Sequence, residues 1–315
     1  MTKIRIVIAV VLTFLSVHMY GEERVKVGQL MYELDNAANT ATVSNNLPAS
    51  FSGYASSDAV KDANKTYASG QVFIPETVNY NGRSYNVTSI STDAFYGSPT
   101  TGVVVPKSVT KIGDSAFQLS RRQSATILNP TVKIGAGAFR HCADLKTVHL
   151  PDGLKEIPNY CFESSGIVGL DIPATVTKIG NSAFQNCKNL RKLTLPPRLT
   201  ELPEFMCQNC VSLKSVSLPE GLTKINRNTF GACQSLSTIN FPTGLKEIGA
   251  LAFAGCKNAN QSAIPAGVAV DPEAFAIPAN APKESTTTKP NAPKQTKQQS
   301  PTKKAAPKKK TSIYD

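Results

Sequence analysis

The residues of this chain best suited to chemistry are seven cysteines and three histidines. Cys207 and Cys210 form a C-x-x-C pair, a spacing that supports redox chemistry in thioredoxin-like proteins. The histidines are His18, His141 and His149. Thiolates and imidazoles can bind zinc, or act as nucleophile and base, provided that the fold brings several of them together. The spacing of these residues therefore decides which chemistry is open to the protein.

The cysteines follow a repeating pattern, and they do not occur in pairs. Five of them stand three residues after a recurrent phenylalanine position, namely Cys142, Cys187, Cys210, Cys233 and Cys256. The odd total and the lack of paired histidines argue against a disulfide framework and against a zinc site. We expect a column of buried free thiols that act as small hydrophobic side chains. Cys207 occupies a phenylalanine position, so the C-x-x-C pair is a weak redox signal.

The histidines do not form a catalytic group with other residues of the sequence. His141 is expected in a turn, and His149 on the outward face of the strand LKTVHLP. Neither has a repeated acidic or nucleophilic neighbour, and a triad needs three converging groups. A glycine-rich phosphate loop, a zinc-protease motif and a nucleophile elbow are all absent from the sequence. We expect no enzyme activity, no catalytic or metal-binding residue and no cofactor.

A repeat of 22 or 23 residues is the element that positions these side chains. Its marker position is occupied in turn by Phe95, Phe117, Phe139, Phe162, Phe184, Cys207, Phe230, Phe253 and Phe275. A period of about 20–29 residues lies in the leucine-rich-repeat range. We expect a β-rich leucine-rich-repeat solenoid, in which stacked coils bury the phenylalanine and cysteine columns because one coil cannot bury its apolar edge alone.

Each unit contains a half-buried strand that ends at a proline. In LKSVSLP, Leu213, Val216 and Leu218 are apolar, whereas Ser215 and Ser217 face the opposite side. Proline lacks the amide that a continuing strand would need. The unit SATILNPTVKIGAGAF looks shorter than the others between its strand and its phenylalanine.

The outward position two residues before each proline forms a column of mostly short polar side chains: Val104, His149, Asp171, Thr194, Ser217, Asn240 and Ala263. Solenoids use such continuous faces to bind large partners. We take His149, Asp171, Thr194, Ser217 and Asn240 as the candidate binding face. The alternative is a solvated face without a partner, since the column has few of the aromatic side chains that dominate hot spots.

The composition and the repeat divide the sequence into four regions. Residues 1–21 have the positive start and apolar run of a signal peptide. Residues 22–90 are expected to form an N-terminal β cap that enters the first coil through Ile90 and Phe95, and residues 91–280 the solenoid. Residues 281–315 are rich in lysine and proline and are expected to form a disordered tail. No segment after the signal is expected to cross a membrane.

The repeated unit resembles a known family. The AFxxCxxLxxLxLP units with LTKIG spacers, over roughly residues 25–278, are similar to BspA-type leucine-rich repeats. The opening VGQLMYELDNAANTATV also resembles the lead-in strands of that family. The resemblance implies a secreted or cell-surface protein associated with adhesion to host glycoproteins or to other cells.

Three functional hypotheses remain open from the sequence. The leading one is an adhesin-like protein that binds protein or glycoprotein partners along the solenoid. The second is an envelope scaffolding protein whose tail, with nine lysines against two acidic residues in 283–315, holds an anionic polymer through charge neutralisation and without sequence-specific reading of nucleic acid. The third is a secreted enzyme with a site in the cap.

Overall fold

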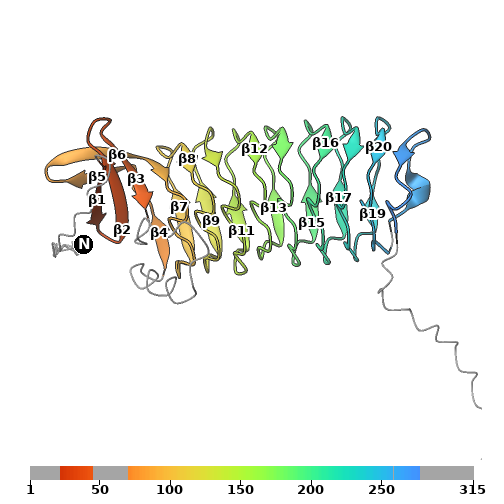
Figure 1. The fold of residues 1–315 in the computed structure, drawn as a ribbon, viewed down its shortest axis with the longest axis horizontal. Helices are drawn as coiled ribbons and strands as arrows, with labels where there is room; N and C mark the ends of the chain where they lie inside the picture. The colour runs from red at the N-terminus through yellow and green to blue at the C-terminus, as the bar shows by residue number, and fades with distance from the viewer. Residues whose placement is uncertain (1–21, 45–69, 258, 277–315) are drawn as a thin grey trace, which may run out of the picture. The chain divides into compact units, whose positions relative to one another are not determined.

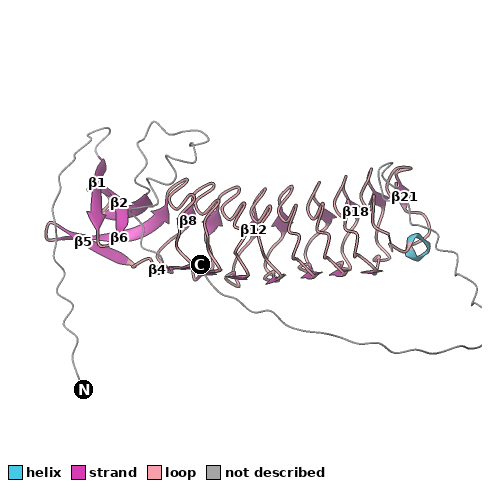
Figure 2. Ribbon diagram, turned by 90° about the horizontal axis from the view of Figure 1, so that it is seen from below, coloured by secondary structure: helices cyan, strands magenta, loops and turns pink. Residues whose placement is uncertain are grey.

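The computed structural model describes residues 22–44, 70–257 and 259–276. The predicted signal peptide with His18 and the predicted tail lie outside the described residues. The described part is a β-rich leucine-rich-repeat solenoid, as the repeat predicts, and its coils follow one another in a row (Figure 1). Figure 2 shows that most of each coil is loop and turn between short strands. The described residues contain no helix with the length and apolarity that crossing a membrane requires.

The N-terminal strands form an antiparallel start to a sheet that continues into the coils. They are β1 (Glu22–Val27), β2 (Leu30–Asp35), β3 (Thr40–Ser44), β5 (Thr77–Tyr80) and β6 (Arg83–Ile90). β1, β2 and β3 pair in antiparallel order, β3 then pairs parallel with β6, and β5 pairs antiparallel with β6. In β2 the burial alternates residue by residue, as expected where one face covers the core. Because β6 also pairs with β8 (Lys111–Ile112) of the first coil, these strands cover the N-terminal edge of the strand row to which β8 belongs.

One strand of each coil except the last joins a row that we call the long-strand sheet. Its first half contains β4 (Gln71–Phe73), β7 (Gly102–Val105), β9 (Ser124–Ile127) and β11 (Thr147–His149). Its second half contains β13 (Gly169–Asp171), β15 (Lys192–Thr194), β17 (Ser215–Ser217) and β19 (Thr238–Ile239). All pairings in both halves are parallel and join like positions of successive coils. The repeat therefore sets the register directly.

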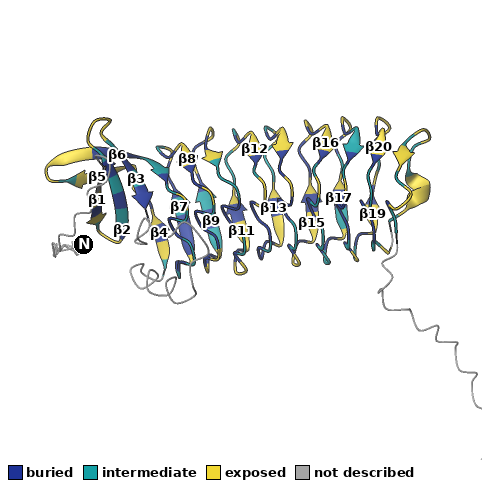
Figure 3. Ribbon diagram, in the orientation of Figure 1, coloured by how far each residue is buried: buried dark blue, intermediate teal, exposed yellow. Residues whose placement is uncertain are grey.

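The second strand of each coil belongs to what we call the short-strand face. Its strands are β8 (Lys111–Ile112), β10 (Lys133–Ile134), β12 (Glu156–Ile157), β14 (Lys178–Ile179), β16 (Glu201–Leu202), β18 (Lys224–Ile225), β20 (Glu247–Ile248) and β21 (Ala269–Val270). In most of them the first side chain is exposed and the second is buried, and Figure 3 shows the resulting alternation of exposed and buried segments along the coils. The apolar positions of both strand rows thus enclose one continuous core.

The phenylalanine column lies at the centre of that core. Phe95, Phe117, Phe139, Phe162, Phe184, Phe230 and Phe253 are each at most 1% exposed. The first five stack ring on ring with centroid distances of 5.1–5.8 Å, and Phe230 stacks on Phe253 at 5.4 Å. Cys207 occupies the gap between the two stacks and is also buried. Offset ring stacking adds to the stabilisation from burial.

Each coil turns sharply at two left-handed backbone positions, two residues before and two residues after the phenylalanine. In the coil of Phe184 these are Ser182, with φ of 57°, and Asn186, with φ of 59°. The amide of each marker residue donates to the next coil, as from Phe184 to the carbonyl of Met206 at 2.8 Å. Glycine and asparagine recur at these positions because they tolerate positive φ better than most residues do.

The expectation that the unit SATILNPTVKIGAGAF is short between strand and phenylalanine is wrong. Both of its strands are in register with the preceding coil, since Ile127 pairs with Val105 and Ile134 pairs with Ile112. The separation between its strands is therefore unchanged. Pro130 simply lies two positions later in this coil than Pro106 does in the preceding coil.

Candidate interaction surface

The outward side of the long-strand sheet presents one short polar side chain per coil. His149, Asp171, Thr194, Ser217 and Asn240 are all exposed. Thr194 pairs directly with Asp171 on one side and with Ser217 on the other. Paired parallel strands lie about 4.8 Å apart, so Asp171, Thr194 and Ser217 form a closely spaced row, with His149 and Asn240 in the coils at its two ends. The row offers hydroxyl, amide, imidazole and carboxylate groups to a partner, with apolar residues beneath it.

The position two residues before each proline does not identify every member of this row correctly. Thr126 pairs with Val104 on one side and with His149 on the other, so it belongs to the row. It does not lie two residues before a proline, because the proline of its coil, Pro130, comes two positions later than in the preceding coil. Ala263, expected in the column, lies instead in the 3₁₀ helix η1 (Gln261–Ala263), so the expectation for this residue is wrong. Phe73 extends the row at its N-terminal end, where it pairs with Val104 and is 67% exposed.

The short-strand face is chemically different. Its first positions carry alternating charges over the later coils, with Glu156, Lys178, Glu201, Lys224 and Glu247 in successive strands, all exposed except Lys224, which is half-buried. Lys178 lies 2.8 Å from Glu156, and Lys224 lies 3.0 Å from Glu247. These charges thus neutralise one another between neighbouring coils. The long-strand sheet instead keeps its polar groups available to solvent.

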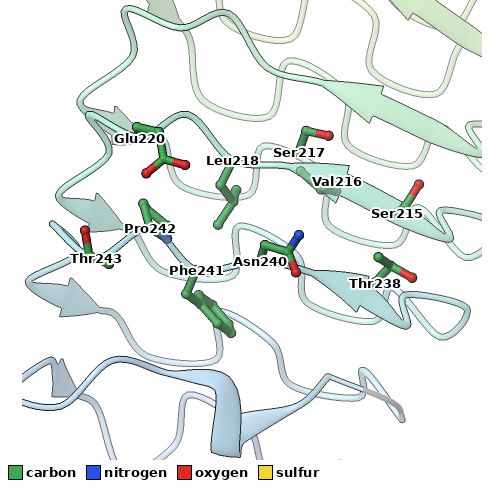
Figure 4. Close-up of a pocket in the computed structure, with 10 residues that line it drawn as sticks. All are labelled: Ser215, Val216, Ser217, Leu218, Glu220, Thr238, Asn240, Phe241, Pro242 and Thr243. Carbon is green, nitrogen blue, oxygen red and sulfur yellow. The ribbon is translucent and has the colours of Figure 1, made fainter.

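A shallow pocket of about 290 Å³ lies at the C-terminal end of the long-strand sheet, between β17 and the segment that follows β19 (Figure 4). Its polar side chains are those of Ser215, Ser217, Glu220, Thr238, Asn240 and Thr243. Leu218 and Phe241 supply apolar surface, and Val216 and Pro242 complete the lining. The periodicity alone gives no sign of this pocket, because it arises where the sheet ends.

The cysteine column is buried except at Cys256, which is partly buried, and its thiols donate hydrogen bonds to the backbone. The Sγ atoms of Cys142, Cys187, Cys210, Cys233 and Cys256 lie 3.0–3.1 Å from the carbonyl oxygen of the marker residue of the preceding coil. Ser120 and Ser165 occupy the same position in two other coils, and each contacts the next cysteine of the column. The column therefore ties coils together, and the described cysteines are free thiols.

Burial makes these thiols poor nucleophiles and poor metal ligands. It raises the pKa of Cys207 and raises that of Cys210 well above its usual value, so both members of the C-x-x-C pair stay protonated. The thiolate is the reactive form of cysteine. The described residues include no group of three or more His, Cys, Asp and Glu side chains placed to hold a metal ion.

Thiol accessibility gives a first prediction. In the native full-length protein, an aromatic disulfide reagent should react with Cys256 alone on the fast timescale, since the other six cysteines are buried and Cys256 is only partly so. All seven should react in denaturant. The substitution Cys256→Ser should remove the fast phase. Rapid labelling of several thiols in the native protein would show that the coils are not closed around the column.

Alkaline stability gives a second prediction. Because burial raises the pKa of Cys187 and Cys161 in the folded state above the value near 9.0 in the unfolded chain, stability should be fully present below pH 9 and fall as the pH rises further. The thermal midpoint measured from neutral pH to about pH 11 should decline. A Cys187→Ser variant should lose less on alkaline titration, because serine does not ionise. An equal decline in both proteins would contradict this assignment.

The two described histidines occupy different parts of the coil. His141 occupies a left-handed turn position with φ of 57°, and its amide donates to the carbonyl of Glu163 at 2.7 Å. His149 ends β11 on the outward face.

Arg122 is a buried residue that the sequence analysis missed. Its side chain is fully buried, and its guanidinium lies 4.8 Å from the ring centroid of Phe95 and 4.4 Å from that of Phe117. A cation over aromatic rings is favourable, and more so away from water. The residue occurs once, outside the periodic pattern, so no repeat position predicts its burial.

The family model described as BspA type leucine rich repeat region matches residues 77–168 and 155–280, in six copies. No curated protein matches this chain.

Solved structures resemble the chain over most of its length. A leucine-rich repeat protein from Bacteroides ovatus is 28% identical, with a TM-score of 0.62, over 73% of this chain and 56% of that one. The leucine-rich repeat protein of T. pallidum is 24% identical over 74% and 89%, with a TM-score of 0.46. The pneumococcal vaccine antigen PcpA is 19% identical over 75% and 74%, with a TM-score of 0.45. The chain thus spans little more than half of the Bacteroides ovatus protein.

The family match covers the phenylalanine and cysteine columns, the whole candidate binding face and every strand of the two rows except β4. The matched residues extend from β5 to beyond β21. The resemblance that the repeated units suggest is therefore confirmed by a match over more than half of the sequence. The chain belongs to the BspA-type leucine-rich repeat family.

Proposed function

We propose that this protein is a secreted or cell-surface interaction protein, adhesin-like and without enzymatic activity, that binds surface macromolecules along the long-strand sheet. The observation that carries the proposal is the row of exposed short polar side chains from His149 to Asn240, one per coil. Repeat proteins use extended faces of this kind for recognition. Membership of a family whose proteins are often surface-associated, and the signal-like residues 1–21, support the extracytoplasmic setting.

A multi-point contact suits this face. Side chains such as Thr194 and Ser217 lose little conformational entropy on binding, because they are short and their backbone is fixed in a sheet. Each contributes modestly, so affinity must come from many coils acting together. Partners with long exposed surfaces, such as matrix proteins and glycoproteins, fit this requirement better than small metabolites do.

The proposal is tested by presenting the full chain to arrays of matrix proteins, glycoproteins and glycans. We expect saturable binding to at least one class of macromolecule, lost when Asp171 and Thr194 are both replaced by lysine. A hydrolase panel run in parallel should show no turnover. Activity that a single substitution in residues 22–90 abolishes without unfolding the protein would favour the secreted enzyme instead.

The lysine-rich C-terminal residues motivate the second candidate, an envelope scaffold that holds an anionic polymer. Nine lysines within 283–315 should bind polyanions through counterion release, so retention on a heparin-like resin should fall steeply with salt. Deleting 283–315 should abolish this retention and leave thermal stability and binding along the sheet unchanged. If the deletion unfolds the protein or removes partner recognition, the segment is part of the fold or the principal binding element.

A further inference from the structure

The pocket at the C-terminal end of the long-strand sheet has a structural origin in the end of the ladder between β17 and β19. Ser215 pairs with Thr238 and Val216 with Ile239, but the register stops there. In the preceding strand pair the ladder extends one residue further, to Thr194 and Ser217. Among the described residues no backbone hydrogen bond joins Leu218 to Asn240, whereas Leu195 donates to Ser217 at 3.3 Å one coil earlier. The two backbone segments diverge after this point, and the pocket lies between them.

The next coil does not cover the opening. Its corresponding segment, Gln261–Ala263, forms the 3₁₀ helix η1 and contributes no strand to the long-strand sheet. β19 is therefore the last strand of that sheet, and Asn240 is the last polar residue of the row. A pocket at the end of a sheet can admit the terminus of a chain-like ligand, because nothing in the described structure continues the face beyond it.

The polar groups that line the pocket are available for a ligand. No hydrogen bond or ion pair between described residues uses the side chains of Ser217, Glu220, Asn240 or Thr243. Elsewhere in the solenoid, asparagines of the turns bond one another, as Asn209 does to Asn186 at 2.7 Å. These four side chains supply one amide, one carboxylate and two hydroxyls that make no hydrogen bond within the described structure, and Ser215 and Thr238 add two further hydroxyls to the lining.

The combination of these groups with apolar surface specifies a ligand class. Figure 4 shows Leu218 between the Glu220 carboxylate and the Asn240 amide, with Phe241 and Pro242 beside them. A carboxylate accepts hydrogen bonds, an amide both donates and accepts, and hydroxyls do either. A saccharide has many hydroxyls around a ring with an apolar carbon face, so it matches both the polar groups and the apolar patch. Glu220 is the only charged residue of the lining, which disfavours an anionic ligand.

We infer that this pocket binds a neutral saccharide at the end of an oligosaccharide chain. The inference rests on the proposed function and names one ligand class for the C-terminal end of the same face. Asn240 and Glu220 are the specificity-determining residues, and Leu218 with Phe241 packs against the sugar ring. The volume of about 290 Å³ lies just below the range of about 300–1,000 Å³ for small-molecule sites, so one or two sugar units fit and the rest of the chain lies outside.

The test titrates the full-length protein with neutral hexasaccharides of glucose, mannose and N-acetylglucosamine, and with N-acetyllactosamine as a glycoprotein-type probe, by calorimetry and saturation-transfer NMR. We expect at least one probe to bind at micromolar to millimolar concentrations. Asn240→Ala and the isosteric Glu220→Gln should each weaken it about tenfold, the effect of losing one good hydrogen bond to a charged or amide group. Thr147→Ala, an exposed change on the same face far from the pocket, should leave it unchanged.

The outcomes separate this inference from the proposed function. If no probe binds at millimolar concentration while matrix-protein binding persists, the saccharide pocket is wrong and the interaction protein stands. If a probe binds with equal affinity to the wild type, Asn240→Ala and Glu220→Gln, saccharide recognition occurs elsewhere and the assignment of this pocket is overturned. If N-acetyllactosamine alone binds, the ligand is a glycoprotein glycan, whereas binding of the glucose or mannose chains points to a polysaccharide.

Discussion

Replacing Phe162 by alanine is expected to lower the free energy of unfolding by about 3–5 kcal/mol, the range for removing a fully buried aromatic side chain. Phe162 is completely buried and stacks on two rings, with centroid distances of 5.5 Å to Phe139 and 5.8 Å to Phe184. The cavity would lie in the middle of the column, where neighbouring coils hold the backbone apart. Denaturant unfolding followed by far-ultraviolet circular dichroism measures the change.

Two matched substitutions sharpen this measurement. Phe230→Ala should cost less than Phe162→Ala by about 0.5–1.5 kcal/mol, because Phe230 stacks on Phe253 on one side and meets Cys207 on the other. Phe73→Ala should change stability by less than about 0.5 kcal/mol, since its side chain is mostly exposed. Equal effects at Phe162 and Phe73 would show that the repeat register is wrong.

The substitution Gly180→Ala is expected to destabilise the protein by about 1–3 kcal/mol, the usual cost of forcing extra atoms into a packed site. A β-carbon at Gly180 would lie closer than 3.0 Å to the backbone nitrogen of Asn159 and to the carbonyl carbon of Pro158 in the preceding coil. The backbone cannot move away easily, because the Gly180 amide donates to Ile157 at 2.8 Å and fixes the coil spacing.

Gly221→Ala is the control for this effect. A β-carbon there meets no atom within 4 Å, so the substitution should be neutral or slightly stabilising through the unfolded state. Thermal midpoints of the two variants and the wild type give the comparison. A Gly180→Ala protein as stable as Gly221→Ala would mean that the coils are more widely spaced than the structure has them.

The phenylalanine and cysteine columns could be predicted because each coil contributes one residue at the same position of the repeat. Phe184 and Cys187 recur with Phe230 and Cys233 at the same offset, and parallel stacking places like residues over like. The fold class and the family therefore follow from the sequence. The outward row could be predicted in part, since alternation within a strand such as LKSVSLP fixes which side chains face outward.

Features that occur once could not be predicted in this way. Thr126 belongs to the row but was missed because Pro130 is shifted in its coil, and Ala263 was included although its segment forms a 3₁₀ helix. Arg122 fills a place beside Phe95 and Phe117 that no repeat position marks. The pocket around Asn240 depends on where the ladder ends, which is a property of one coil against the next.

The proposal that the partner binds along the long-strand sheet is tested most directly by adding charge to each face of the solenoid in turn. One variant carries Thr194→Lys and Ser217→Lys on the long-strand sheet, and its control carries Thr177→Lys and Thr200→Lys, exposed positions beside the short-strand face with the same added charge. Binding of each full-length protein to the macromolecule captured by the wild type is measured by biolayer interferometry. The account predicts at least about tenfold weaker binding for the first variant and wild-type binding for the control. Wild-type binding by the first variant, or an equal loss in the control, would contradict it.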